Sequence, residues 1–533
     1  MTSTSLPAMI TDLQRPDRHT PPAAHVELLQ THISWVIIAD QLVYKIKKPV
    51  DFGFIDYSTL EKRKFYCQEE LRLNRRLSAG VYLRVEPIVK RREGYFFGGE
   101  GEVVDYAVVM KKLPRERLMV RLLARGELTP AHVRRLARRL AEFYRQAAVI
   151  DDGSFGTLDT VAYNIRENFT QTEKYLGRCL SEADYRRLID YNERFFAAHE
   201  DLFARRVAAG MIKECHGDLH MEHVCFTNDH LDIYDCIEFN DRFRLIDVVA
   251  DIAFMAMDLD YHDRYDLAAV FLAEFAGSFD DADGRQLLPL YKCYRAYVRG
   301  KVISFLLDDP SLPAAEKERA AARARRYFRL ATVYTYQPAA PMLLLVTGIS
   351  GSGKSYLAGA LAGLSGFLWL RSDQVRKELA GLPPTAAAGA AFQEGLYSPV
   401  MTRSTYDALA RRADRELEAG RGVIVDATCL SRWQRQLFLE LAGDRQVPVK
   451  VVSCTAPWEV VAERLQRREE KGGDLSDADR QIAARQLEAR QLPTAGELAA
   501  CSWIEHDTTP ELLDQLYREL LDQLYRLLPR LAD

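Results

Sequence analysis

The segment MLLLVTGISGSGKS, Met342 to Ser355, decides the fold of the second half of the chain. A short apolar run, typical of a strand buried on both faces of a parallel sheet, leads directly into the pattern G-x-x-x-x-G-K-S. Glycines at these positions let successive backbone N–H groups point at one oxyanion, and Lys354 adds a positive charge beside them. The segment therefore predicts a strand, a phosphate-binding loop and a helix, which together begin an α/β domain.

Each position of this loop has an expected role. Lys354 is expected to reach the β- and γ-phosphates of a nucleotide, and Ser355 to offer its hydroxyl to Mg²⁺. The backbone at the other positions is expected to surround the phosphates, at Gly348, Ser350, Gly351, Ser352 and Gly353. ATP and Mg²⁺ are accordingly the predicted cofactors.

Two carboxylates follow further strand candidates of this domain. Apolar runs at LWLR (368–371), GVIVDAT (422–428) and VKVVSCT (449–455) alternate with helical stretches, which predicts a parallel sheet whose strand ends face the ligand crevice. Asp373 follows the first run and has two interpretations, a base that accepts a hydroxyl proton or an ordinary helix cap. Asp426 ends the strand of the second run and is expected to hold the water shell of Mg²⁺.

An arginine-rich helix follows the third run. Arg464, Arg467 and Arg468 are spaced i, i+3, i+4 before a Gly-Gly pair, which suits either a mobile arginine lid or a solvated helix face. Together with the loop, these features favour a kinase, with Arg464 and Arg468 as residues that neutralise the transferring phosphoryl group.

At these residues the chain resembles the P-loop kinases of small hydroxyl substrates, the group that includes gluconate kinase, the zeta toxins and the 5′-hydroxyl polynucleotide kinases. The resemblance covers residues 342–533. It implies that Asp373 accepts the substrate proton, while Lys354 and the lid arginines neutralise phosphoryl charge. These motifs are specific for phosphotransfer and do not indicate which hydroxyl is the acceptor.

The first half of the chain contains the segment ECHGDLHMEHVCF, Glu214 to Phe226. One interpretation is a zinc site built from Cys215, His216, His220, His223 and Cys225. This interpretation lacks the acidic helix signature of a metalloprotease and a second ligand pair with zinc-finger spacing. The favoured interpretation is a catalytic loop, because Asp218, a metal-liganding His223 five residues later and Asp235 at a strand end have kinase-like spacing.

Upstream residues fit the same interpretation. Two β-rich runs separated by Ala39-Asp40-Gln41 predict a hairpin that carries Lys45, and a helix with a capping box formed by Ser58 and Glu61 is expected next. Glu70 flanks the apolar face of that helix, where it can pair with Lys45. Met110 lies on a later strand, at the lobe connection against which adenine is expected to pack.

This arrangement resembles the aminoglycoside phosphotransferase-like kinases over residues 34–334. The resemblance implies that Asp218 is the catalytic aspartate and that Asp235 binds Mg²⁺. His223 stands where the family usually has Asn, and imidazole prefers softer metals than Mg²⁺. No obvious Gly-rich loop precedes Lys45, and the acidic residues Asp247 and Asp251 are expected to hold the catalytic loop in place.

The predicted fold class is an α+β protein-kinase-like bilobal domain followed by an α/β P-loop domain with a parallel sheet. A flexible N-terminus is expected over 1–33, the first kinase domain over 34–334, a linker over 335–341 and the P-loop kinase domain over 342–533. A repetitive amphipathic helix at 511–528 is expected to serve packing rather than chemistry.

The amino-acid composition restricts the cellular compartment and the binding partners that we expect. Lys plus Arg is 72 against 76 for Asp plus Glu, which does not indicate a constitutive nucleic-acid or membrane binder. The nine cysteines form no C-x-x-C pair, which suits reduced thiols, and no apolar run of membrane-spanning length occurs. We therefore expect a cytoplasmic protein that does not bind membranes.

Three functional hypotheses follow. The first is an ATP-dependent phosphotransferase with two sites, each acting on a hydroxyl-bearing small molecule. The second is an ATP-binding regulator whose first domain is a pseudokinase, as the His223 substitution suggests. The third is a 5′-hydroxyl kinase, with nucleic acid as the partner of the P-loop domain. The acceptors and the oligomeric state are not specified by the sequence.

Overall fold

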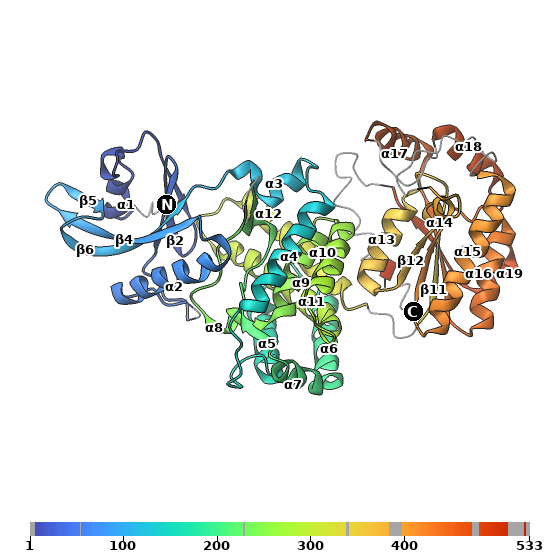
Figure 1. Ribbon diagram of the computed structural model, residues 1–533, viewed down its shortest axis with the longest axis horizontal. Coiled ribbons are helices and arrows are strands. Elements are labelled where there is room, and N and C mark those ends of the chain that lie inside the picture. The colour runs from blue at the N-terminus through green and yellow to red at the C-terminus, as the bar shows by residue number, and fades with distance from the viewer. Residues whose placement is uncertain are drawn as a thin grey trace. The chain divides into compact units, whose positions relative to one another are not determined.

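The computed structural model describes residues 6–53, 55–227, 230–336, 341–382, 397–471, 479–509 and 527–528. The centre of the predicted linker, the Gly-Gly pair after the lid arginines and nearly all of the predicted terminal helix at 511–528 lie outside these ranges. The chain divides into two compact units, each described by itself below (Figure 1). Their ranges are Met1–Lys174, Ile189–Leu259 and Val270–Val298 for the first, and Tyr175–Leu188, Asp260–Ala269 and Arg299–Asp533 for the second.

The first unit begins with a six-stranded antiparallel sheet in the order β1-β2-β3-β6-β4-β5. The predicted hairpin is present between β2 and β3, and Asp40 in its turn adopts a left-handed φ of 50°, which Asp tolerates. The strands are β1 Val26–Gln30, β2 Ser34–Ala39, β3 Leu42–Lys47, β4 Tyr82–Arg91, β5 Gly94–Phe97 and β6 Glu102–Lys111.

The beginning of the chain differs from the prediction of a flexible segment over 1–33. Helix α1, Ala8–Leu13, buries Ile10 and Leu13 in the apolar core of the sheet, and β1 pairs along its length with β2. A six-residue helix is too short to show a helical period in sequence, and β1 is mostly exposed. The prediction was therefore wrong from Ala8 onward.

Helix α2, Leu60–Ser78, packs against β4 and β6. Its N-cap is Thr59, whose hydroxyl accepts a hydrogen bond from the Lys62 backbone N–H, and not Ser58 as predicted. The Ser58 hydroxyl instead donates to the Asp56 carboxylate at 2.6 Å, since a short side chain in a turn bonds its own local backbone and neighbours. The start of the helix is thus shifted by one residue, and its buried face includes Cys67, Glu70 and Leu77.

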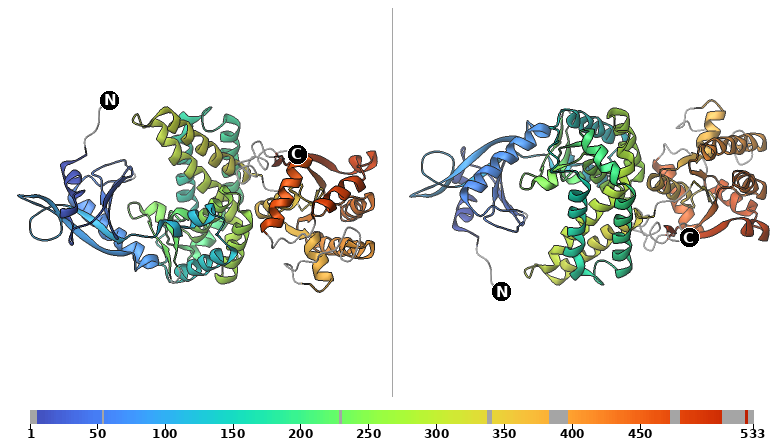
Figure 2. Two further views of the ribbon diagram at one scale, coloured as in Figure 1. Left: turned by 90° about the horizontal axis from the view of Figure 1, so that it is seen from above. Right: turned by 90° about the horizontal axis from the view of Figure 1, so that it is seen from below.

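A helical lobe follows the sheet, and Figure 2 shows the blue strands and the green helices as separate lobes. Two small antiparallel pairs, β7 with β10 and β8 with β9, position the loops that carry Asp218 and Asp235. The helices are α3 Met119–Ala124, α4 Pro130–Gln146, α5 Leu158–Thr172, α6 Glu182–Ala198, α7 Glu200–Ala208, α8 Asp241–Arg244, α9 Val248–Tyr261, α10 Tyr265–Ser278, α11 Gly284–Ser304 and α12 Ala314–Val333. The short strands are β7 Ile212–Glu214, β8 Val224–Phe226, β9 Leu231–Ile233 and β10 Leu245–Asp247.

The second half of the chain forms a five-stranded parallel sheet in the order β12-β13-β11-β14-β15. Together with the bilobal first part, this sheet confirms the predicted fold class. The strands are β11 Leu343–Thr347, β12 Leu368–Arg371, β13 Val423–Asp426, β14 Val449–Thr455 and β15 Ser502–Asp507, the last of which was not predicted. The helices are α13 Lys354–Ser365, α14 Ser372–Leu379, α15 Pro399–Glu418, α16 Arg432–Asp444, α17 Trp458–Lys471, α18 Arg480–Ala489 and α19 Ala495–Ala500. Within the described residues, no helix is both long enough and apolar enough to span a bilayer.

Candidate functional sites

Lys45 lies at the centre of the first candidate site. Its Nζ is 2.8 Å from Glu70 Oε1 and 2.6 Å from Asp235 Oδ1, so the predicted Lys–Glu ion pair is present. Burial lowers the pKa of Lys45, but Asp235 and Glu70 raise it well above its usual value. The lysine therefore stays charged between the strand, helix α2 and the loop after β9.

A second lysine on the same face of β3 was not predicted. Lys47 Nζ is 2.7 Å from Glu70 Oε2 and also pairs with the buried Glu238. The Tyr57 hydroxyl donates to Glu238 at 2.5 Å, which completes a buried polar cluster. Side chains two residues apart share one face of a strand. The spacing of Lys45 and Lys47 could therefore have predicted that both lysines face the same side of β3.

The loop that carries Asp218 is held by Asp251 of α9, as predicted. Its carboxylate accepts hydrogen bonds from the backbone N–H groups of His216 at 2.6 Å and Gly217 at 2.9 Å. Gly217 has a φ of 88°, and a Cβ there would lie 2.7 Å from the Phe243 carbonyl oxygen. Asp247 differs from the prediction, because it pairs with Arg206 at 2.7 Å instead of the loop.

Four predicted polar residues converge beside this loop. His223 Nδ1 lies 2.9 Å from the Asp218 backbone oxygen, and His223 Nε2 lies 3.5 Å from Asp235 Oδ2. His220 Nε2 is 3.5 Å from Asp218 Oδ2. Burial and the neighbouring His220 lower the pKa of His223 to about 4. Burial raises the pKa of Asp235, but Lys45 and His223 lower it to well below its usual value.

This donor set fits a divalent cation. One donor atom each from Asp218, His220 and His223 lies within 4.8 Å of the others, and carboxylate and imidazole are both common metal ligands. The two cysteines of the zinc interpretation bond elsewhere, Cys215 to the Ile246 carbonyl oxygen at 3.4 Å and Cys225 to the Pro114 carbonyl oxygen at 4.0 Å. The structure thus separates the thiols from the histidine cluster.

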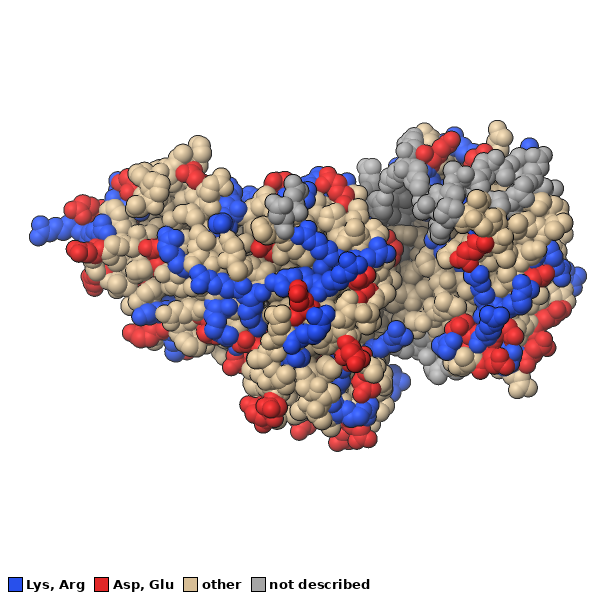
Figure 3. Space-filling model, in the orientation of Figure 1, with Lys and Arg blue, Asp and Glu red and all other residues tan. Residues whose placement is uncertain are grey.

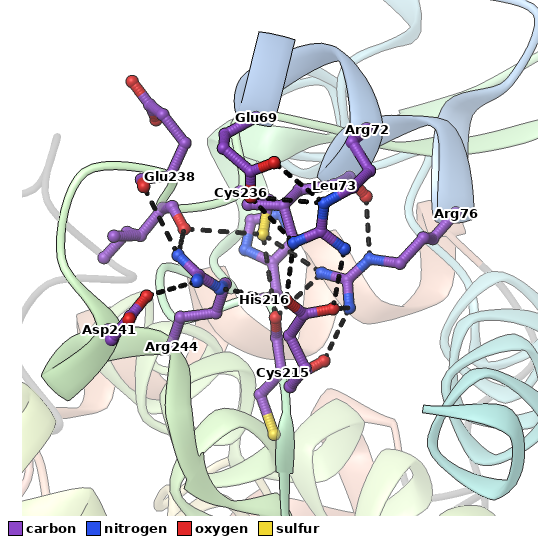
Figure 4. A network of polar contacts seen from close by, with 12 residues as sticks. Glu69, Arg72, Leu73, Arg76, Cys215, His216, Cys236, Glu238, Asp241 and Arg244 are labelled. Carbon is purple, nitrogen blue, oxygen red and sulfur yellow. Dashed lines mark hydrogen bonds and ion pairs between the residues drawn. The ribbon is translucent and has the colours of Figure 1, made fainter. Parts of the chain in front are cut away.

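A polar network ties helix α2 to both loops (Figure 4). Arg72 and Arg76 of α2 contact the Glu214 carboxylate at 2.7 and 3.1 Å, and Arg76 also donates to the Cys215 carbonyl oxygen at 3.1 Å. On the other side, Arg244 donates to the Ile237 carbonyl oxygen at 3.0 Å. The helix that carries Glu70 is therefore coupled to the segments that carry Asp218 and Asp235.

Met110 lies on β6 opposite Val43 and Tyr82. It packs in an apolar cluster with Tyr82 and Tyr234, and the Tyr82 hydroxyl accepts a hydrogen bond from the Asp235 backbone N–H at 3.2 Å. An apolar surface next to Asp235 is suited to a nucleobase, and the role of Met110 there stays a prediction.

The second candidate site is the loop between β11 and α13, which has the predicted strand, loop and helix context. Gly348 has a φ of 144°, and a Cβ there would lie 2.6 Å from the Cys454 carbonyl oxygen. The Ser350 N–H donates to Gln486 Oε1 at 2.8 Å, and the Thr508 hydroxyl donates to the Ser352 carbonyl oxygen at 2.7 Å. Side chains from distant segments thus fix the loop, and neither was predicted.

Asp426 ends β13 beside this loop and is buried. Burial raises its pKa above the usual value, while Lys354 and the Ser355 hydroxyl act in the opposite direction. Among the described residues, Asp426 Oδ1 has no hydrogen-bond partner. A buried carboxylate oxygen beside a hydroxyl is a donor set that suits Mg²⁺, which normally keeps several waters.

Asp373 belongs to the first turn of α14, and Arg376 Nη1 donates to its Oδ1 at 3.0 Å. The N-cap is Arg371, so Asp373 is not the cap. Asp373 lines a pocket of about 230 Å³ whose other walls include Ser350, Arg376, Tyr406, Trp433 and Gln434. The pocket places this carboxylate next to the phosphate-binding loop.

The lid arginines lie on α17. Arg464 Nη1 lies 3.0 Å from the Thr508 hydroxyl and 3.4 Å from the Gly351 carbonyl oxygen, which places it at the loop. Arg467 pairs with Glu463 on an exposed face, and Arg468 is half-buried on the same helix. The lid role of Arg468 stays a prediction, because the following glycines lie outside the described residues.

A basic groove of about 1150 Å³ lies on the first unit, where Figure 3 shows a band of blue side chains. Its cationic walls are Lys111, Lys112, Arg135, Arg138, Arg139 and Arg145, against the two acidic residues Glu142 and Asp232. Among its described lining residues His230 is the only one with an aromatic ring, and Phe, Tyr and Trp, the usual platforms for base stacking, do not occur there. The net charge of the whole chain, -4, does not reveal this local excess of positive charge.

Comparison with known proteins gives consistent assignments. Residues 64–297 match the model of the phosphotransferase enzyme family, and residues 343–493 match an AAA domain model. Uncharacterized proteins Rv2004c of Mycobacterium tuberculosis and Mb2027c of Mycobacterium bovis are each 32% identical over 469 residues, which covers 87% of this chain and 90% of theirs.

Solved structures of low sequence identity to this chain include a choline/ethanolamine kinase family protein and a gluconokinase. A choline/ethanolamine kinase family protein from Mesorhizobium loti is 14% identical, with a TM-score of 0.37, and covers 61% of this chain and 99% of its own. A gluconokinase from Sinorhizobium meliloti 1021 is 22% identical, with a TM-score of 0.25, and covers 36% of this chain and 97% of its own.

Proposed function

Because the chain belongs to the same family as these mycobacterial proteins, and because a phosphotransferase domain precedes a P-loop kinase-like domain in it, we propose that it is an ATP-dependent phosphotransferase with two sites. Each site transfers the γ-phosphoryl group to a hydroxyl acceptor. The observation that carries this proposal is the contact of Lys45 with both Glu70 and Asp235, next to Asp218. A charged lysine between two carboxylates suits phosphate binding beside a metal.

In the first site, Asp218 accepts the proton of the acceptor hydroxyl. The freed oxygen forms a bond to the γ-phosphorus while the bond from that phosphorus to the bridging oxygen breaks, and ADP leaves with the electron pair. Lys45 holds the phosphates in position, and Glu70 holds Lys45. His223 and Asp235 would hold the divalent cation, which supplies positive charge to the phosphates when bound.

In the second site, Asp373 accepts the proton of the acceptor hydroxyl, as Asp218 does in the first site. Lys354 and Arg464 lie at the loop and neutralise negative charge on the transferring group. Ser355 and Asp426 would hold Mg²⁺, in keeping with the buried oxygen of Asp426 that lacks a partner among the described residues. Neither site needs a residue from the other.

The acceptor of the second site is proposed to be a hydroxyl-bearing small molecule. The pocket at Asp373 holds about 230 Å³, below the size of a typical drug-sized ligand site, and is lined by hydroxyl, amide and aromatic side chains. A nucleic-acid end would insert only its terminal nucleotide there, so the 5′-hydroxyl kinase is the second candidate. A cytoplasmic location is also proposed, since all nine cysteines are unpaired thiols.

The test is transfer from [γ-³²P]ATP to fractionated cell metabolites and to RNA with 5′-hydroxyl ends. The wild-type protein is compared with Asp218→Asn, Asp373→Asn and the double variant. Metabolite label of which one part is lost in Asp218→Asn, another part in Asp373→Asn and all in the double variant supports two active sites. Label that never depends on Asp218 would make the first domain a pseudokinase, and label confined to RNA ends would favour the nucleic-acid kinase.

A further inference from the structure

We propose that an imidazole nitrogen, Nε2 of His223, is a direct metal ligand in the Asp218 site, and that this site selects Mn²⁺ over Mg²⁺. The proposal rests on the proposed function, because that function is what requires a cation at Asp235. It goes further by naming the donor atom and the ion.

The ring of His223 has a defined orientation. Its Nδ1 lies 2.9 Å from the Asp218 backbone oxygen, and a carbonyl oxygen can only accept a hydrogen bond. Nδ1 therefore carries the hydrogen, and the other nitrogen of the neutral ring, Nε2, presents a lone pair. Fixing one nitrogen to a carbonyl so that the other faces a metal is the usual arrangement of a ligating histidine.

A carboxylate lies close to that nitrogen. Nε2 lies 3.5 Å from Asp235 Oδ2, and Lys45 contacts the other oxygen, Oδ1, at 2.6 Å. Two electron-rich atoms facing each other are stable when a cation lies between them. Nitrogen and oxygen donors bind divalent metals at about 2.0–2.2 Å, so both atoms can reach one ion without displacement of either side chain.

The donor set determines the ion. Mg²⁺ prefers six oxygens and loses its waters reluctantly, whereas first-row transition ions accept imidazole more readily. Of the ions that carboxylate and phosphate oxygens suit, Mg²⁺, Ca²⁺ and Mn²⁺, only Mn²⁺ is a first-row transition ion, so it tolerates an imidazole nitrogen among these oxygens better than Mg²⁺ does. An Asn at position 223 would offer a carbonyl oxygen and lower the preference for Mn²⁺.

His220 is the competing candidate ligand, because it belongs to the same group of donor atoms as Asp218 and His223. Its Nε2 is 3.5 Å from Asp218 Oδ2 and its ring lies 4.0 Å from that of His223, so it shares the neighbourhood. An ion that used His220 would draw on the Asp218 carboxylate, which the proposed reaction requires as a base. The proposal therefore assigns the nitrogen contact to His223 alone.

The decisive measurement is electron spin echo envelope modulation of Mn²⁺ in the full chain with a non-hydrolysable ATP analogue. Lys354→Ala removes nucleotide from the second site, and protein grown with ¹⁵N-histidine is compared with unlabelled protein. We expect ¹⁴N modulation that changes to a ¹⁵N pattern on labelling, persists in His220→Asn and is lost in His223→Asn. A spectrum unaffected by histidine labelling would overturn the proposal without any substitution at a histidine.

Metal affinity gives a second readout. The ratio of Mn²⁺ to Mg²⁺ affinity, measured by competition calorimetry, is expected to fall about tenfold or more in His223→Asn and to stay unchanged in His32→Asn, a control at an exposed histidine outside the site. An equal ratio in wild type and His223→Asn would contradict the selection of Mn²⁺. If the spectrum shows histidine nitrogen but no phosphotransfer depends on Asp218, the proposed function fails while the metal assignment stands.

Discussion

Lys45 Nζ lies 2.6 Å from Asp235 Oδ1, although 190 residues separate the two in the sequence. Glu70 holds the same ammonium group from helix α2 at 2.8 Å. This contact joins the sheet lobe to the loop that follows β9. It places one positive charge where a kinase-like site needs it, against the carboxylate proposed to bind the metal.

Lys45→Met is expected to reduce Asp218-dependent phosphotransfer by about 10²-fold or more, because the phosphates lose their positioning cation. Folding should survive, since Lys47 still pairs with Glu70 at 2.7 Å. Label transfer measures the loss of phosphotransfer, and circular dichroism checks that the variant is folded. Lys90→Met, at an exposed position of β4, is the control that should change neither.

Lys47→Met is expected to act on stability. Lys47 and Glu70 are almost fully buried, and Glu238 beside them is nearly so. Removing the lysine leaves two buried carboxylates without their shared cation, at a cost of about 3–5 kcal/mol. Urea unfolding, with Lys90→Met again as the control, measures this loss. A midpoint equal to that of wild type would mean that the cluster is not formed in solution.

His223 should make the metal-free protein sensitive to acid. Its pKa is lowered to about 4 in the folded protein, below about 6.5 in the unfolded chain, so the unfolded state binds more protons between these values. Stability therefore rises as pH increases from about 4 to 6.5 and is level above, with a contribution of up to about 3 kcal/mol. Unfolding in EDTA as a function of pH should show a shallower slope for His223→Asn.

The sequence predicted features whose spacing is local and missed those assembled from distant segments. The phosphate-binding loop, the catalytic loop with Asp218 and the lysine on β3 each lie within a few residues of the motif that reveals them. The groups that complete the sites do not. Gln486 and Thr508 fix the phosphate-binding loop from more than a hundred residues away, and their residue types carry no motif.

Short or exposed elements were also missed for a physical reason. Helix α1 has only six residues and β1 is mostly exposed, so neither shows a clear hydrophobic period. The N-cap of α2 fell on Thr59 instead of Ser58 because both residues can cap and only the turn at Asp56 decides between them. Burial of Lys47 depends on Glu238, which no local pattern links to it.

Lys354→Ala is expected to remove most nucleotide binding by the P-loop domain, because it deletes the loop cation that faces the β- and γ-phosphates. Lys354 is the first residue of α13, where Ala is well tolerated, so the fold should be retained. Equilibrium binding of a fluorescent ATP analogue in the Lys45→Met background isolates this site. Unchanged affinity there would contradict the assignment of the phosphate-binding loop.

The last prediction concerns the independence of the two sites. Asp218→Asn should abolish transfer by the first domain and Asp373→Asn transfer by the second, each leaving the other reaction detectable. Asn keeps the shape of the side chain but cannot take the proton, so a loss of about 10²-fold or more is expected at the altered site. Charge neutralisation is local in each case, by Lys45 in one site and by Lys354 with Arg464 in the other. Acceptor-resolved label transfer by the two variants, each compared with wild type, makes the measurement. If Asp373→Asn eliminated all transfer while Asp218→Asn left it intact, the first domain would be a nucleotide-binding regulator of the second.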